Sequence, residues 1–126
     1  MRAVDTNVLV RIVAQDDPKQ VRAAEAFIAA GAWVSTLVLM EAMWVLGSVY
    51  DRDSGAIAAA VDNLLEHDKI VVQDPDVVTA ALARFRERPT LSFSDCLILQ
   101  VARRAGHLPL GTFDRGLAKL DGTARI

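Results

Sequence analysis

Two acidic residues of the chain stand directly after short apolar runs, where a strand should give way to a helix. Asp5 follows the run that reaches Val4, and Asp114 follows the run from Leu108 to Thr112. In open α/β sheets, ligands bind at the carboxyl ends of the strands. We therefore expect both carboxylates at the mouth of a crevice, each beside the start of a helix.

Two further acids stand out by their surroundings. Glu41 is the one charged residue between Leu37 and Leu46, and a helix that is apolar on every side is predicted to be buried. An unpaired buried carboxylate is costly, so we expect Glu41 to be protonated, paired from elsewhere or bound to a cation. Asp95 falls in the first turn of a predicted helix, where the helix dipole favours an anion.

Taken singly, three of these acids have simpler explanations. Asp5 could be only the N-cap of the following helix, Asp95 could belong to a capping box, and Asp114 could be a turn residue. Only Glu41 lacks such an explanation, because its neighbours predict burial. In a parallel α/β sheet, however, all four positions can converge at one edge.

Four converging carboxylates would repel one another unless cations lay between them. Oxygen ligands without His or Cys suit hard ions such as Mg²⁺ or Mn²⁺. A metal that activates water and neutralises phosphate charge would suit phosphodiester hydrolysis. His67 and His107 lie away from these motifs, so neither a zinc site nor a histidine-based triad is predicted.

The elements that must position these acids follow from turn and periodicity signals. Asp17-Pro18 and Asp74-Pro75 each predict a helix start, and Gly31 and Gly106 each predict a helix end. Short strands alternate with helices along the whole chain, which predicts a parallel sheet covered on both faces. Helices are predicted over residues 7–14, 18–30, 36–50, 57–66, 75–88, 95–105 and 116–120, and strands over 3–4, 32–34, 70–72, 108–112 and 123–126.

Composition indicates one globular domain spanning residues 1–126. The chain is 52% apolar and 24% charged, and its net charge of −2 lacks the basic footprint of an obligate duplex-DNA binder. Its single cysteine, Cys96, cannot form an internal disulfide, and no stretch resembles a signal peptide or a bilayer span. We therefore expect a cytoplasmic protein.

The ordered set of motifs resembles the PIN domain family, and more narrowly the VapC-type toxins of type II toxin–antitoxin systems. The motifs are Asp5-Thr6-Asn7-Val8-Leu9, Glu41 in its apolar helix, Ser94-Asp95-Cys96-Leu97-Ile98, and Thr112-Phe113-Asp114. The resemblance covers essentially the whole chain. Phe113 departs from the family pattern, in which a polar or basic residue is common.

The resemblance implies an endoribonuclease that depends on Mg²⁺ or Mn²⁺ and folds as a three-layer α/β/α sandwich with a short parallel sheet of four to five strands. Asp5, Glu41, Asp95 and Asp114 match the family's catalytic and metal-binding acids. Asn7 and Thr112 match the polar residues that orient them, in an outer shell around the metal. The family also implies a homodimer held inactive by a cognate antitoxin protein.

Basic and aromatic residues near these motifs are candidates for contact with RNA. The alternative for the arginines is a solvated basic face. Trp33, Trp44 and Phe93 could stack on bases, although Trp33 and Trp44 are expected to be core or dimer contacts, and Met40, Met43 and Trp44 could contribute to self-association. The candidate RNA contacts are Arg11, Arg84, Arg86, Arg88 and Arg115.

Four other functional classes share some of these sequence features. A phosphatase of the haloacid dehalogenase type would need an acid at Asn7 and a lysine near the later acids, and a response-regulator receiver would need paired acids after the first strand and a late lysine. A non-catalytic α/β interaction module would have no reason to bury Glu41. A PIN-type nuclease acting on DNA or in RNA processing stays open.

Overall fold

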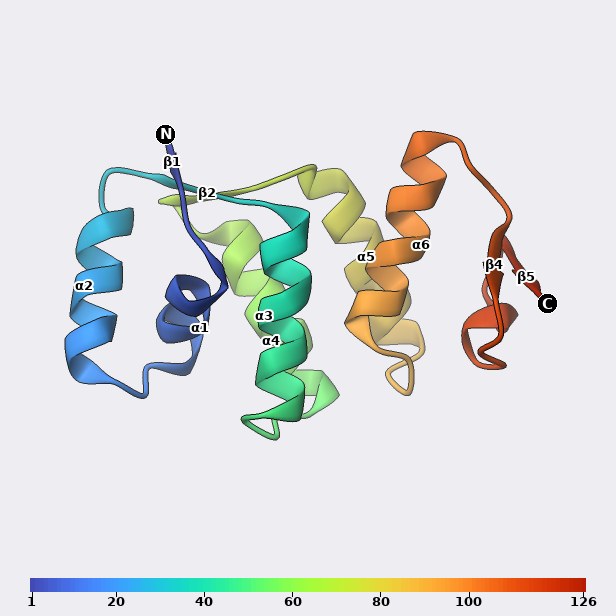
Figure 1. The fold of residues 1–126 in the computed structure, drawn as a ribbon, viewed down its shortest axis with the longest axis horizontal. Coiled ribbons are helices and arrows are strands. Elements are labelled where there is room, and N and C mark those ends of the chain that lie inside the picture. Colours follow the sequence, from blue (N-terminus) through green and yellow to red (C-terminus); the bar gives the residue numbers. More distant parts are fainter. The chain divides into compact units, whose positions relative to one another are not determined.

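All five strands of the protein are short and pair in parallel, and they divide between two sheets (Figure 1). The computed structural model describes residues 1–126, which form two units, Met1–Pro75 and Asp76–Ile126. The first unit contains a three-stranded sheet in the order β1-β2-β3, and the second contains the pair β4-β5. The prediction of an α/β fold built on short parallel strands is confirmed, with the strands shared between two sheets.

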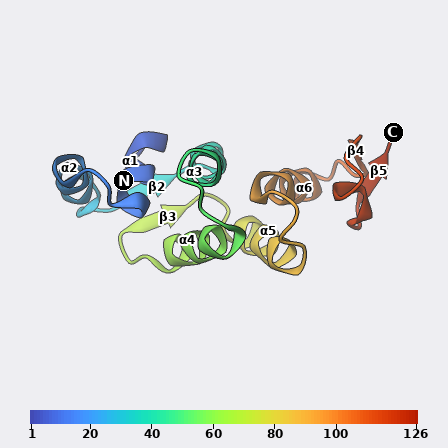
Figure 2. The ribbon, with the colours of Figure 1, turned by 90° about the horizontal axis from the view of Figure 1, so that it is seen from below.

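The first unit alternates strands with pairs of helices. β2 lies between β1 and β3, with Arg2 opposite Ala32 and Val34 opposite Val72. Helix α1 packs against both α2 and α3, and α4 packs against β3 (Figure 2). The elements are β1 (Arg2–Ala3), α1 (Thr6–Ala14), α2 (Pro18–Ile28), β2 (Ala32–Val34), α3 (Thr36–Ser48), α4 (Ser54–Glu66) and β3 (Ile70–Val72).

Each helix of the first unit begins at a short polar side chain that caps it. Asp5, Asp17, Ser35 and Asp53 have extended backbones, and each accepts a hydrogen bond from the backbone amide three residues later. These bonds satisfy amides that have no partner within the helix. The predicted helix starts near residues 7, 18 and 36 are confirmed to within one residue.

The burial of α3 differs from the prediction. Leu39 is fully buried and Leu46 nearly so, but Leu37 is 72% exposed, Trp44 is 61% exposed and Glu41 is exposed. The prediction that Glu41 is buried is therefore wrong, as is a core position for Trp44. A helix that is apolar all round carries no periodic signal, so its sequence does not show which face enters the core.

The second unit packs two helices around aromatic side chains. Phe85 and Phe93 lie edge to face with their ring centroids 5.9 Å apart, and Val78 and Leu97 are buried. The stretch predicted as a helix over residues 116–120 is a single 3₁₀ turn. The elements are α5 (Pro75–Glu87), α6 (Phe93–Ala105), β4 (Leu110–Thr112), the 3₁₀ turn η1 (Leu117–Lys119) and β5 (Thr123–Arg125).

No helix of the structure has the length and apolar character needed to cross a membrane.

Candidate active site

Asp5 stands where β1 gives way to α1. The Val4 amide donates to the Trp33 carbonyl at 3.2 Å, which ties this end of the strand to β2. Asp5 then turns the chain into α1, and its Oδ1 accepts a hydrogen bond from the Val8 amide at 3.0 Å. Asp5 therefore does cap α1, but capping occupies only one of its two carboxylate oxygens. The side chain is exposed, so the other oxygen remains available to a ligand.

Asp114 repeats this local arrangement in the second unit. It follows β4, and its Oδ1 accepts a hydrogen bond from the Leu117 amide at 2.8 Å. The Asp114 amide in turn donates to the Thr112 hydroxyl at 3.0 Å. Thr112 therefore fixes the backbone that carries the carboxylate, which is the kind of contact an orienting residue makes.

Asp95 lies in the first turn of α6, half-buried. Ser92 caps this helix by accepting a hydrogen bond from the Asp95 amide at 3.0 Å, so the Asp95 carboxylate itself is not used in capping. Burial raises the pKa of the neighbouring Cys96 thiol to about 11, the Asp95 carboxylate adds to the rise, and Arg84 opposes it. The carboxylate of Asp95 is free to accept a ligand.

The four acids offer the type of donor that a hard cation takes. None of them forms an ion pair with a basic side chain, and all of their donors are carboxylate oxygens. Asp5 and Glu41 belong to the first unit, and Asp95 and Asp114 to the second. Neither unit by itself contains three or more His, Cys, Asp or Glu side chains placed to hold a metal ion.

Asn7 lines the same groove as Asp5 but forms no hydrogen bond with an acid. This groove between α1 and α2 has a volume of about 350 Å³, with Arg11 and Gln20 at its polar side and Phe27 at its apolar side. The Asn7 amide is exposed. An orienting role for Asn7 stays a prediction.

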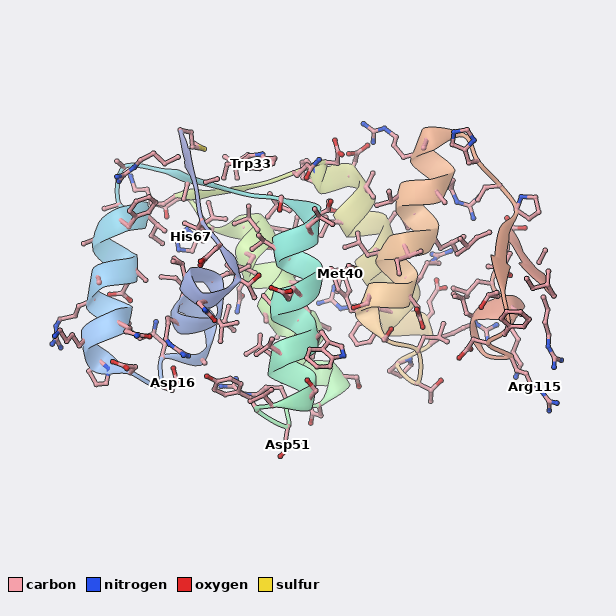
Figure 3. All side chains as sticks on the ribbon, viewed as in Figure 1. Asp16, Trp33, Met40, Asp51, His67 and Arg115 are labelled. Carbon is pink, nitrogen blue, oxygen red and sulfur yellow. The ribbon has the colours of Figure 1, made fainter.

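Arg11, a predicted RNA contact, is already engaged by other side chains of the first unit. It donates to Asp16 at 3.1 Å, to the Tyr50 hydroxyl at 2.8 Å and to Gln20 at 2.7 Å. The Tyr50 hydroxyl donates to Asp16 at 2.7 Å, and this bond is the main cause of the lowered pKa of Asp16, which is labelled in Figure 3. Sequence reasoning missed this cluster, because Tyr50 lies 34 residues from Asp16 and 39 from Arg11.

Replacing Tyr50 by Phe tests the cluster through its pH dependence. Because the pKa of Asp16 is lowered in the folded protein, its contribution to stability is present above the pKa of the unfolded chain and is lost as the pH falls through the folded value. Tyr50→Phe should raise the pKa of Asp16 and lower the melting temperature slightly at neutral pH. We expect this difference from wild type to shrink at a pH below the pKa of Asp16, where only the lost bond from Arg11 to the Tyr50 hydroxyl remains. Thermal melts across pH and NMR titration of Asp16 measure both effects; a difference as large in acid as at neutral pH would contradict this assignment.

The remaining predicted RNA contacts all lie in the second unit. Arg84 donates to Glu87 at 3.0 Å, whereas Arg88 and Arg115 are exposed and form no ion pair; Figure 3 labels Arg115. Arg86 is exposed as well. Phe93 is buried against Phe85, so the prediction that it could stack on bases is wrong.

Comparison with known proteins agrees with these features. Residues 2–123 match the PIN domain, which is nearly the whole chain. This chain therefore belongs to the PIN domain family, a nuclease-type fold family to which its α/β fold conforms. PIN domains are generally nucleases that act on nucleic acids, typically with divalent metal ions. No curated protein and no solved structure matches the chain significantly.

Proposed function

We propose that this protein is an endoribonuclease that hydrolyses RNA phosphodiester bonds with Mg²⁺ or Mn²⁺. The observation that carries the proposal is that all four acids expected of a PIN nuclease are present in order and that no basic side chain neutralises any of them. Carboxylates without a cationic partner are suited to hold a metal ion.

Asp5, Glu41, Asp95 and Asp114 are the proposed metal-binding and catalytic residues. A bound metal supplies a water of lowered pKa and neutralises charge on the phosphate. The free oxygens of Asp5 and Asp114 and the uncommitted carboxylates of Asp95 and Glu41 are the atoms that would be offered to metal ions. Asn7 and Thr112 would keep the acids in place.

We further propose that residues 1–126 act as one PIN-like domain, as the cytoplasmic toxin of a toxin–antitoxin pair. A cognate antitoxin would neutralise it, and the active form would be a homodimer. Support for self-association comes from α3, where Trp44 is exposed beside the partly exposed Met40, which Figure 3 labels. Apolar side chains that lie together as a patch on a surface mark sites of interaction.

The direct test is incubation of the purified protein with single-stranded RNA in Mg²⁺, in Mn²⁺ and in EDTA, followed by sequencing of the cleaved ends. We expect defined cuts with either metal and none in EDTA. A parallel reaction with single-stranded DNA separates an RNA-specific enzyme from a DNA nuclease. Absence of cleavage of either nucleic acid with every metal would overturn the proposal and leave the non-catalytic interaction module.

The exposure of Glu41 removes the argument that its burial would give against such a module. Membership of the PIN domain family is the reason for which we propose an enzyme and not a non-catalytic interaction module.

A further inference from the structure

The second unit contains a groove that the proposed active site does not use. The groove has a volume of about 530 Å³ and is formed by α5, α6 and the turn at η1. Four cationic and two acidic side chains line it, so its charge is positive. They are Arg84, Arg88, Arg103 and Lys119, with Glu87 and Asp121.

The cations of the groove are only partly neutralised. Arg84 pairs with Glu87 at 3.0 Å, and Arg103 donates to the Asp121 carbonyl at 2.8 Å and lies 4.0 Å from its carboxylate. Arg88 and Lys119 form no ion pair. Two positive charges are therefore left for a ligand.

Two polar groups of the groove have no partner within the protein. Gln100 lines the groove, is only 9% exposed as a residue, and its side-chain amide makes no hydrogen bond. The Nε of Arg84 is buried and has no acceptor. A buried donor without an acceptor costs stability, so the groove is suited to a ligand that supplies acceptor oxygens.

We propose that this groove binds a phosphate group of the RNA strand. The proposal rests on the function proposed above and adds where the substrate is held. Each phosphodiester of an RNA strand carries one negative charge on two non-bridging oxygens, and neighbouring phosphates of the strand would accept hydrogen bonds from the two unpaired cations and the Gln100 amide. A carboxylate also has two acceptor oxygens, so the choice of RNA over an acidic peptide follows from the proposed nuclease function, and competition by a peptide tests it.

Helix α6 carries both Asp95 and part of this groove. Asp95 lies in the first turn of α6, and Gln100 and Arg103 follow on the same helix. At 1.5 Å per residue, they lie about 7 Å and 12 Å further along the helix axis. A phosphate bound in the groove would thus be held by the same rigid element that carries Asp95, and the groove would fix the register of the strand.

The test measures binding of a fluorescent single-stranded RNA in EDTA, where cleavage cannot occur. We expect the double variant Arg88→Ala/Lys119→Ala to bind at least about tenfold more weakly than wild type. Loss of two phosphate contacts should also reduce the dependence of log K on log salt by about 1.4. The matched control is Lys19→Ala/Arg22→Ala, which removes two exposed cations of α2 that do not line this groove and should change the affinity little.

A second variant, Gln100→Leu, removes the unpaired amide but keeps the size of the side chain. We expect it to melt within a few degrees of wild type and to bind RNA roughly five- to tenfold more weakly, since one donor to phosphate is lost. Inorganic phosphate should shift the NMR signals of the wild-type Gln100 side-chain amide, and the RNA should shift the same signals.

Several results would overturn the groove proposal: unchanged affinity in both variants, an equal loss in the control, or displacement of the RNA by a hexaglutamate peptide at lower concentration than by phosphate. If the wild-type protein cleaves RNA but any of these results is obtained, the nuclease function is supported and the groove proposal is refuted. Groove-dependent RNA binding without cleavage in any metal would instead support the groove and overturn the nuclease function.

Discussion

Asp5→Asn and Asp95→Asn are each expected to abolish metal-dependent RNA cleavage while leaving the fold intact. Loss of one charged ligand would weaken the metal's stabilisation of the transition state by about 4 kcal/mol, which corresponds to roughly a thousandfold lower rate. The measurement is the single-turnover rate of RNA cleavage in Mg²⁺ and in Mn²⁺, with circular dichroism to confirm folding.

The fold should survive because neither substitution removes a structural bond. Asparagine caps helices about as well as aspartate, so its side-chain oxygen can still accept from the Val8 amide in α1. The Asp95 carboxylate caps no helix, since Ser92 is the N-cap of α6. Both variants should therefore melt within a few degrees of the wild-type protein.

Asp53→Asn is the matched control for Asp5→Asn. Asp53 caps α4 through the Ala56 amide at 2.8 Å, as Asp5 caps α1, but it has no proposed role in catalysis. It should cleave RNA like wild type. If Asp53→Asn lost as much activity as Asp5→Asn, or if Asp5→Asn kept full activity, the metal role of Asp5 would be refuted.

Leu39→Ala is expected to destabilise the protein by about 3 kcal/mol, the usual cost of a cavity in a close-packed core. Leu39 is fully buried on α3. Leu37→Ala removes the same atoms from the same helix, but Leu37 is 72% exposed, so the free energy of unfolding should change by less than about 0.5 kcal/mol. Urea unfolding followed by circular dichroism measures both values.

This pair of variants tests which face of α3 is buried. Equal losses at Leu37 and Leu39 would show that the exposed side of the helix is also covered in the native protein. Measuring the two variants over a range of protein concentrations would show whether a second copy of the chain covers this face. In that case the decrease in the free energy of unfolding caused by Leu37→Ala would become smaller at low concentration.

Local structure was predictable wherever a short-range chemical signal existed. The proline after Asp17 and the β-branched run Ile70–Val72 each predicted an element that the structure contains. Gly106 ends α6 with φ at 82°, a conformation that glycine adopts without strain. In each case the contact that determines the element joins residues a few positions apart, so the local sequence is enough to predict the element.

Features that depend on distant contacts were not predictable in the same way. The uniform apolarity of α3 hid the fact that Glu41 is exposed. The partners of Arg11 come from the turn after α1 and the end of α3, and no local pattern indicates them. For the candidate site, a capping role was foreseen for Asp5 and a turn position for Asp114, whereas the unpaired amide of Gln100 depends on the packing of α6.

The hydrogen bonds at Asp5 and Asp114 have a consequence for how an ion would be captured. Each carboxylate is clamped by one oxygen to a backbone amide, so its remaining oxygen points in a direction set when the chain folds. A flexible carboxylate loses rotational freedom when it binds an ion, but a clamped one has little left to lose. The first turn of α1 and the turn at η1 thus hold the two carboxylates in a fixed orientation. The affinity of these two acids for an ion therefore depends on the backbone conformation as well as on the side chains.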